Sequence, residues 1–396
     1  MEMDTMMHVD IDWKSLNKYG EELCGDKVEI VHQDDCDILV LSDGLGSGVK
    51  ANILASLTAK IIVTMLKEGS SVDEAVETIA HTLPICKVRQ VAYSTFSILQ
   101  LYHDGRAYLV EFDNPACIFI RHGQLTDLPY EVREISGKSV RECRFDTAMG
   151  DIFALVSDGV IHAGVGAILN LGWQWENVAA FFQDAAQKKL SVPRMVSSIA
   201  QVVDNLFMSK PGDDSTMLVA QIVPQKVVSL FSGPPTDKSK DETLVRDWMR
   251  GPGKKVVCGG SSANIVSRVL NRQIKTSLKF TDPLIPPTAE IQGVDLVTEG
   301  VLTINRTVEL LRKWQNRDVR TAVSSIASFD EDNGASKLAR LLVEDCTDLH
   351  CFIGKAINPA HQNPNLPMDL SIKMHLLNEL MDLMKQMGKR VQVTYY

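Results

Sequence analysis

The chain has 396 residues, a length typical of two domains of ordinary size. Hydrophobic residues make up 45% and charged residues 23%, which is the balance of a soluble globular protein. The formal net charge of -9 at pH 7 argues against a nucleic-acid surface and against a polybasic membrane anchor. The acidic start has no signal-peptide core, and no run approaches the ~18 apolar residues of a membrane span. We therefore expect a cytoplasmic protein with no nucleic-acid or membrane partner.

The first half of the chain predicts blocks of strands and helices in alternation. The helix expected at 71–82 opens on a capping box, Ser71-Val-Asp-Glu74. In chain order we expect two short strands within 27–41, helices at 49–67 and 71–82, strands at 92–102, 106–112, 117–121 and 151–157, helices at 175–187 and 193–207, and a strand at 217–223. This order predicts an α+β fold, an αββα sandwich in which helices cover two sheets.

Residues 225–250 are expected to form a linker between an N-terminal domain, 1–224, and a C-terminal domain, 251–396. The stretch contains Ser232-Gly-Pro-Pro and a charged run at 237–243, with no apolar period. Beyond it, strand and helix patterns alternate: strands at 254–258, 294–297, 349–353 and 391–395, and helices ending at 270, starting at 302 and 335, and spanning 370–387. The alternation predicts a smaller α/β domain with a mainly parallel sheet.

Acidic residues follow apolar runs at three places in the first domain. The sequences are Leu-Ser-Asp43-Gly44, Val-Ser-Asp158-Gly159 and Gly212-Asp213-Asp214-Ser215-Thr216, the last of which precedes an apolar run. Any single Asp-Gly step is typical of a turn. If the fold brings these strand ends together, however, the carboxylates repel one another and need divalent metal, and oxygen ligands suit Mg²⁺ and Mn²⁺. The pattern therefore indicates a two-metal hydrolase of phosphate esters.

Five motifs in order resemble one known family. They are Cys24-Gly25-Asp26, Ser42-Asp43-Gly44-Leu45-Gly46-Ser47-Gly48, Tyr93-Ser94-Thr95-Phe96, Ser157-Asp158-Gly159 and Asp213-Asp214-Ser215-Thr216. Over roughly residues 15–224 the chain resembles the SpoIIE-type bacterial phosphatases, which are metal-dependent serine/threonine phosphatases of type 2C (PPM).

The resemblance implies a set of metal ligands for two divalent ions, Mn²⁺ or Mg²⁺. Asp43 would bridge the two metals, with the backbone carbonyl of Gly44 as a further ligand. Asp158 and Asp213 would complete the shell of one metal, so that Asp43, Asp158 and Asp213 are the catalytic carboxylates. Asp26 matches a further family aspartate of the cluster.

Two positions of the family pattern are less directly matched. Asp214 is a further candidate metal ligand, at a position where many relatives have Asn or Asp. The Arg-rich N-terminal motif of animal-type relatives is missing, so the phosphate-contacting arginine is unassigned, with Arg89 as the candidate.

The helices at 49–67 and 72–82 have two interpretations. They form ordinary cover for a sheet, or they act as the regulatory switch that the corresponding pair provides in SpoIIE-type relatives. In the second interpretation Gly69, between the helices, is the hinge.

In the second domain, Gly259-Gly260-Ser261-Ser262 lies at a strand-to-helix turn, where exposed helix N–H groups suit an anion. The alternative is a glycine pair that only permits a tight turn. A sensory or docking role for this domain follows from architecture alone.

The leading hypothesis is a protein serine/threonine phosphatase in bacterial signalling, with two-metal activation of water. By family analogy its substrate is a phosphorylated anti-anti-sigma-like regulator, and homodimer formation stays open. One alternative is a small-molecule phosphoesterase. Another is a non-catalytic phosphatase-fold scaffold with a ligand-binding C-terminal domain, and the intact acidic set counts against it.

Overall fold

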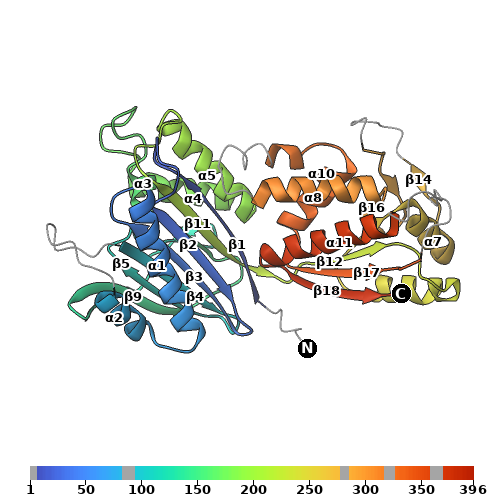
Figure 1. Ribbon diagram of the computed structural model, residues 1–396, viewed down its shortest axis with the longest axis horizontal. Coiled ribbons are helices and arrows are strands. Elements are labelled where there is room, and N and C mark those ends of the chain that lie inside the picture. The colour runs from blue at the N-terminus through green and yellow to red at the C-terminus, as the bar shows by residue number, and fades with distance from the viewer. Residues whose placement is uncertain (1–6, 83–93, 277–284, 316–325, 357–368) are drawn as a thin grey trace. The chain divides into compact units, whose positions relative to one another are not determined.

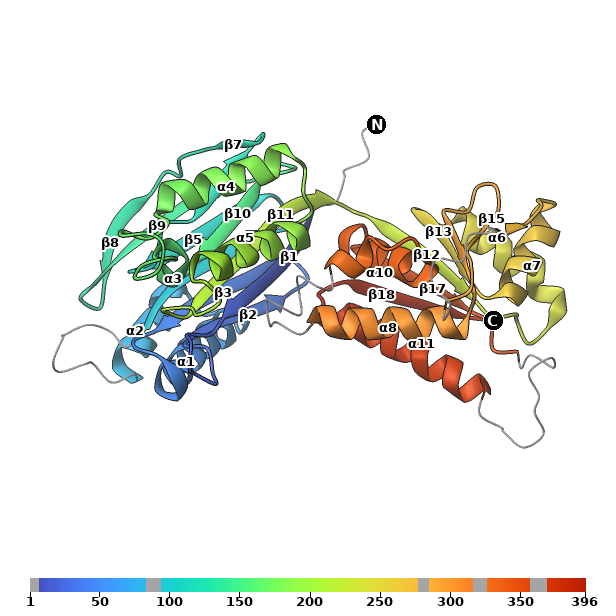
Figure 2. The same cartoon turned by 90° about the horizontal axis from the view of Figure 1, so that it is seen from above.

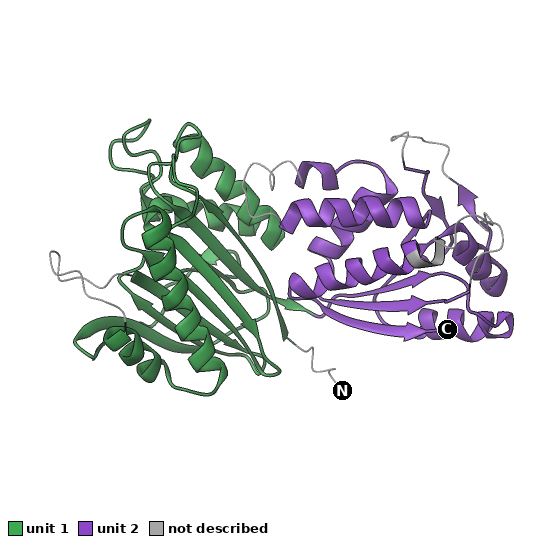
Figure 3. Cartoon of the chain, in the orientation of Figure 1, with its two compact units in different colours: residues 1–224, 317–323 green, residues 225–316, 324–396 purple. Residues whose placement is uncertain are grey.

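The computed structural model describes residues 7–82, 94–276, 285–315, 326–356 and 369–396, with the side chains of the last segment from residue 372 onward. The chain divides into two compact units, and each is described by itself (Figure 3). Unit 1 contains residues 1–224 with 317–323, and unit 2 contains 225–316 and 324–396.

Unit 1 contains two antiparallel sheets (Figures 1 and 2). The five-stranded sheet has the order β1 (Met7–Leu16), β11 (Ser215–Pro224), β10 (Ile152–Val156), β6 (Ile118–Arg121) and β7 (Gln124–Leu125). The six-stranded sheet has the order β2 (Asp26–His32), β3 (Cys36–Gly44), β4 (Ser94–Tyr102), β5 (Arg106–Phe112), β9 (Lys138–Asp146) and β8 (Glu131–Ile135). The helices are α1 (Gly48–Lys67), α2 (Val72–Thr82), α3 (Asp158–Ile161), α4 (Trp175–Gln187) and α5 (Val192–Leu206).

Three apolar layers hold these elements together. The strands alternate, so that Ile38 and Val40 of β3 pack with α1 and α2, whereas Leu39 and Leu41 pack between the two sheets. A third layer joins the five-stranded sheet to α4 and α5 and includes the fully buried Phe182. The layers follow the order helix, sheet, sheet, helix, which confirms the predicted αββα sandwich.

Helix α1 is long and apolar enough, by length and composition, to cross a membrane, and it is the one such helix among the described residues. The expectation concerned unbroken apolar runs, and this helix contains none of ~18 residues because Lys50, Asn52 and Lys60 interrupt it. One face of the helix is buried on the six-stranded sheet, and a helix that covers a sheet passes the same test.

Unit 2 is built on a seven-stranded sheet with a parallel centre. Its order is β14 (Lys275–Thr276), β15 (Ala289–Glu290), β16 (Leu296–Thr298), β13 (Lys254–Cys258), β12 (Val227–Ser232), β17 (Asp348–Ile353) and β18 (Arg390–Tyr395). The five strands from β16 to β18 pair in parallel, and β14 and β15 are antiparallel. The helical elements are η1 (Lys238–Lys240), α6 (Asp241–Arg250), α7 (Gly260–Leu270), α8 (Val301–Gln315), α10 (Gly334–Glu344) and α11 (Asp369–Gln386). The prediction of a mainly parallel α/β domain is confirmed.

The predicted linker at 225–250 was wrong. Strand β12 is the central strand of the parallel sheet, and it pairs with β13 and β17. Helix α6 buries Leu244, Val245 and Trp248, and the Trp248 indole N–H donates to the Ser229 carbonyl at 2.9 Å. The Gly-Pro-Pro step lies in the loop after β12, and the charged run forms η1 and the first residues of α6.

Candidate metal centre

The predicted carboxylates meet at one end of the unit 1 sandwich. Asp26 begins β2 and Asp43 lies near the end of β3, and the two are paired in register. Asp158 follows β10, and Asp213 and Asp214 immediately precede β11. The charge of Asp158 acts on the Asp43 carboxyl, so the end of one sheet lies close to the end of the other.

Hydrogen bonds between β10 and β11 hold the second acidic loop in place. The backbone N–H of Ser157 donates to the Thr216 carbonyl at 2.9 Å. In return, the Thr216 N–H donates to the Ser157 hydroxyl at 2.8 Å. The serine before Asp158 therefore fixes the strand end from which that aspartate extends.

Close backbone contacts explain the glycine that follows each of the two aspartates. A Cβ atom at Gly44 would lie 2.2 Å from the Ala51 carbonyl oxygen of α1. A Cβ atom at Gly159 would lie 2.0 Å from the Asp214 carbonyl oxygen. Both positions accept only glycine without movement of the backbone, which goes beyond the general turn preference of Asp-Gly.

Burial and mutual repulsion raise the pKa values of Asp26, Asp43 and Asp213. Burial, followed by the charges of Asp26 and Asp158, raises the pKa of Asp43 from 3.8 to about 10. Burial is also the main reason why the pKa of Asp26 rises from 3.8 to about 7, although the Ser157 and Thr216 hydroxyls lower it. The pKa of Asp213 is raised by burial and by Asp158, and Lys18 opposes this shift. Without a counter-ion, protons therefore occupy the centre near neutral pH.

Lys18 is a residue of this site that the sequence did not reveal. Its ammonium lies 3.8 Å from an Asp213 oxygen, and its backbone N–H donates to Asp214 Oδ1 at 2.9 Å. The signal was faint, because Lys18 stands in the loop before Cys24-Gly25-Asp26 with no motif of its own.

The donor atoms at this end of the sandwich suit a hard divalent cation. Asp26 is buried, and although the Ser157 and Thr216 hydroxyls lie near enough to lower its pKa, no hydrogen bond of ordinary geometry reaches either of its oxygens or Asp214 Oδ2. Such orphaned buried oxygens are costly unless a cation binds them. Among the described residues, no group of three His, Cys, Asp or Glu side chains is closed around one ion position. The chemistry of the set fits divalent metal.

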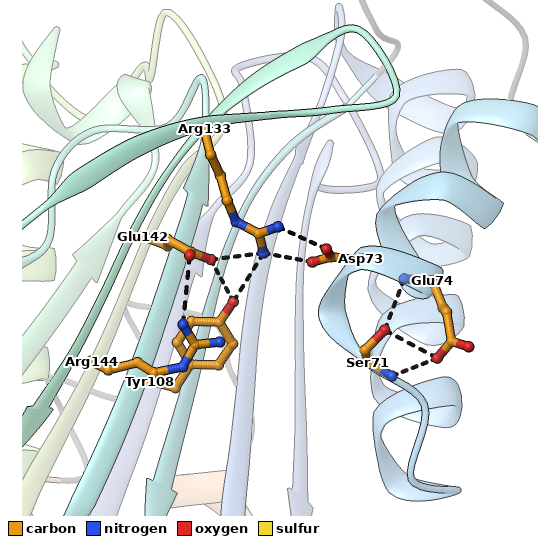
Figure 4. A network of polar contacts seen from close by, with 7 residues as sticks. All are labelled: Ser71, Asp73, Glu74, Tyr108, Arg133, Glu142 and Arg144. Atoms are coloured by element: carbon orange, nitrogen blue, oxygen red, sulfur yellow. Dashed lines mark hydrogen bonds and ion pairs between the residues drawn. The ribbon is translucent and has the colours of Figure 1, made fainter.

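The turn between α1 and α2 was predicted as a hinge, and the structure shows what secures it (Figure 4). Gly69 has a φ of +88°, which favours glycine. The expected capping box is present, because the Ser71 N–H donates to Glu74 Oε2 at 2.8 Å and the Glu74 N–H donates to the Ser71 hydroxyl at 3.2 Å. Asp73, in the first turn of α2, is bound by Arg133 through two hydrogen bonds of 2.5 and 2.7 Å.

Arg133 comes from β8 and joins α2 to the sheet. The same guanidinium lies 2.9 Å from Glu142 Oε2 on β9. Glu142 also accepts a 2.6 Å hydrogen bond from the Tyr108 hydroxyl, and Arg144 stacks 3.8 Å from the centre of the Tyr108 ring. Figure 4 shows Arg133 between Asp73 on the helix and Glu142 on the sheet. The start of α2 is thus held by one ionic bridge.

In unit 2, the predicted anion-binding turn lies between β13 and α7. Gly259 has a φ of +124°, and the next two residues, Gly260 and Ser261, are exposed. Ser262 is buried, and its hydroxyl accepts the Gly233 N–H at 2.7 Å. The Ser262 hydroxyl therefore serves the fold, and the open donors of this turn are at Gly260 and Ser261.

One predicted residue lies outside the described part of the chain. Arg89, the candidate phosphate contact, belongs to 83–93, between α2 and β4.

Residues 33–223 match the family model for Stage II sporulation protein E (SpoIIE). No curated protein matches the chain. The PP2C phosphatase domain and regulatory-domain fragment of SpoIIE from Bacillus subtilis is 17% identical, with 56% of this chain and 66% of that chain covered and a TM-score of 0.47. The RsbU and RsbW domains of Rv1364c from Mycobacterium tuberculosis are 18% identical, with coverages of 62% and 70% and a TM-score of 0.46. RsbX in complex with magnesium is 18% identical, with coverages of 56% and 98% and a TM-score of 0.40.

Proposed function

Because residues 33–223 form a SpoIIE-type domain of the PPM phosphatases, we propose that unit 1 is a metal-dependent protein serine/threonine phosphatase in bacterial signalling. The observation that carries this proposal is the meeting of Asp43 and Asp158 from two different sheets, with Asp26 and Asp213 beside them. Four carboxyls at one sandwich end are costly without cations. Hydrolysis of phosphate esters accounts for this arrangement, because the clustered carboxylates would bind the divalent cations that the reaction needs.

In the proposed mechanism, Asp43 would bind both cations. Asp158 and Asp213 would bind one of them, and the Gly44 carbonyl and Asp26 would contribute further oxygens. Asp214 is kept in place by the Lys18 backbone. When bound, two divalent cations lower the pKa of water and neutralise the phosphoryl oxygens.

The chemistry that this arrangement serves is in-line hydrolysis. The water oxygen forms a bond to phosphorus on the side opposite the seryl oxygen, the P–O bond to serine breaks, and the serine oxygen takes up a proton. No covalent protein nucleophile takes part. The role of unit 1 is to hold the carboxylates against their mutual repulsion, which the paired strands β2 and β3 and the paired strands β10 and β11 achieve.

The test is hydrolysis of p-nitrophenyl phosphate and of phosphoserine peptides, with and without Mn²⁺. Asp43→Asn and Asp158→Asn should each abolish turnover with little loss of fold, because an amide keeps the shape and removes the charge that holds metal. The matched control is Asp184→Asn, which removes an exposed carboxylate paired with Lys188 on α4. Near-normal Mn²⁺-dependent activity in either active-site variant would refute the two-metal reading.

We also propose a phosphorylated anti-anti-sigma-like protein as substrate and the Gly69 turn as the point of regulation. Loop 44–48 leads directly from Asp43 into α1, so a shift of α1 and α2 moves the bridging carboxylate. A partner or self-association would supply the shift. The test is a Mn²⁺ titration of activity for wild type and Gly69→Ala at several protein concentrations. If wild type and Gly69→Ala reach full activity at the same low Mn²⁺ concentration, independent of protein concentration, the helices only cover the sheet and the regulatory proposal is wrong.

For unit 2 we propose an anion site at the N–H groups of Gly260 and Ser261, where α7 begins. Gly260→Val should abolish binding of inorganic phosphate to this turn and leave hydrolysis of p-nitrophenyl phosphate unchanged. Equal phosphate binding by wild type and Gly260→Val, measured calorimetrically without metal, would contradict the site.

A further inference from the structure

Two serine hydroxyls lie directly behind the Asp43–Gly44 peptide. Ser42 is fully buried and Ser94 is 3% exposed. Their oxygens are 2.5 Å apart, and Ser94 Oγ is 2.9 Å from the carbonyl oxygen of Asp43. A buried hydroxyl pair at the end of a strand joins the last residues of β3 to the first residue of β4.

The Ser94 hydroxyl donates to the Asp43 carbonyl at 2.9 Å, which is its shorter contact with a carbonyl oxygen, since the Thr95 carbonyl is 3.3 Å away. A carbonyl oxygen only accepts. With the Ser94 proton on Asp43, Ser94 Oγ accepts from Ser42, whose hydroxyl also lies 3.1 Å from the Thr95 carbonyl. The Asp43 carbonyl is also joined to the Gly44 nitrogen, whose N–H donates to the Gly25 carbonyl at 3.1 Å. Both polar groups of this peptide are therefore bound, and the peptide cannot rotate without breaking one of the bonds.

The two serines do not share the face of the carboxylates. Along β3 and β4, Val40, Phe96 and Ile98 pack toward α1 and α2, and the alternation of the strand places Ser42 and Ser94 on this side. The Asp43 side chain lies on the opposite face, where it meets Asp158. The hydroxyls thus act on the carboxylate only through the backbone.

We propose that Ser42 and Ser94 are positioning residues of the metal centre. Their hydroxyl chain fixes the Asp43–Gly44 peptide, so that the Asp43 carboxylate and the Gly44 carbonyl are set for metal before metal arrives. The neighbouring carboxylates repel the Asp43 carboxylate, and a fixed backbone holds it in position against this repulsion. The inference rests on the proposed function, since it assigns a role at the same site. Groups that orient metal ligands typically change metal affinity by about 10–100-fold when removed.

The experiment measures Mn²⁺ affinity by isothermal titration calorimetry on the full chain, with the Mn²⁺ electron paramagnetic resonance spectrum as a second readout. Ser94→Ala and Ser42→Ala should each weaken Mn²⁺ binding about tenfold. Ser94→Thr keeps the hydroxyl and should restore the affinity to within about threefold of wild type. The matched control is Ser97→Ala on the same strand. Ser97 is fully buried, and its hydroxyl accepts a hydrogen bond from the Asn114 amide rather than binding the Asp43–Gly44 peptide, so its loss should leave Mn²⁺ affinity unchanged.

The outcomes separate the two proposals. If wild type binds no Mn²⁺, the proposed function fails and the inference fails with it. If wild type binds Mn²⁺ and Ser94→Ala, Ser42→Ala and Ser97→Ala all bind equally well, only the positioning role is overturned. If Ser94→Ala does not fold, Ser42→Ala and Ser94→Thr decide: an unchanged affinity of Ser42→Ala overturns the inference, and a weakened one supports it.

Discussion

Asp26 offers a direct measure of how much the acidic centre destabilises unit 1 when metal is withheld. In the folded protein its pKa is raised from 3.8 to about 7, chiefly by burial. As the pH rises, Asp26 ionises first in the unfolded chain, because its pKa is lower there. Its contribution to the free energy of unfolding is therefore greatest below pH 3.8 and falls as the pH rises toward 7. Each pKa unit corresponds to about 1.4 kcal/mol, so the loss between these limits is about 4 kcal/mol.

The perturbation is Asp26→Asn in metal-free protein. The amide cannot ionise, so the variant should lack this loss and exceed wild type at pH 7–8 by up to about 4 kcal/mol, or roughly 10 °C in the Tm of unit 1. Differential scanning calorimetry in EDTA from pH 5 to 8 measures the difference. Mn²⁺ should raise the Tm of wild type at pH 8 and act much more weakly on the variant.

Asp184→Asn is the control and should follow the wild-type pH profile, because that carboxylate is exposed on α4. The reasoning is refuted if wild-type stability rises from pH 5 to 8 without metal. It is equally refuted if Asp26→Asn has the same pH slope as wild type.

Three further perturbations test other parts of the structure. Arg133→Gln removes the ionic bridge between Asp73 and Glu142. The free energy of unfolding should fall by about 1–2 kcal/mol, and hydrogen exchange should become faster in α2 but not in α4. Unchanged exchange in α2 would contradict a stabilising role of the bridge. Gly44→Ala places a Cβ atom 2.2 Å from the Ala51 carbonyl oxygen, so Mn²⁺ binding should be lost. The control Gly46→Ala meets no atom within 4 Å and tests only the strain of a positive φ. Equal Mn²⁺ affinity of Gly44→Ala and wild type would show that the contact relaxes. Trp248→Ala should destabilise unit 2 by about 3–5 kcal/mol, because the indole is fully buried. The unfolding transition of unit 1 should not change. A loss below about 1 kcal/mol would mean that α6 contributes little to the core of unit 2.

The elements that the sequence predicted well are those with strong local patterns. The helix expected at 49–67 is observed as Gly48–Lys67, and the capping box at Ser71 and Glu74 is formed. These depend on apolar periodicity and on side chains three residues apart, both of which are local.

The elements that were missed depend on distant partners. Strand β1 carries Asp10, Asp12 and Lys14 at buried positions and pairs along its whole length with β11, about two hundred residues later. Because charged residues occupy its buried positions, the sequence pattern did not predict this strand, and only its pairing with β11 identifies it. Strands β8 and β9 are similarly rich in charge, and β8 is largely exposed.

The candidate site divides in the same way. The aspartates at strand ends were visible in the sequence, because Ser-Asp-Gly after an apolar run is a local signal. Their convergence was not visible, because it requires two sheets to stack. The serine before each aspartate was apparent as a pattern, but its partners, Ser94 for Ser42 and Thr216 for Ser157, are known only from the pairing of strands.

The position of β12 determines how the chain can be cut. Two residues separate the end of β11 at Pro224 from Val227, which begins the middle one of the five parallel strands of unit 2. Strand β12 pairs residue by residue with β17, which the ribosome makes more than a hundred residues later. A fragment that stops at residue 224 ends cleanly after a complete sandwich. A fragment that stops at residue 250 would carry the apolar segment Val227–Ser232 without either neighbour, as an unpaired strand that invites aggregation. During synthesis the same segment stays unpaired until β13 and then β17 emerge, so the second unit folds late and as a whole.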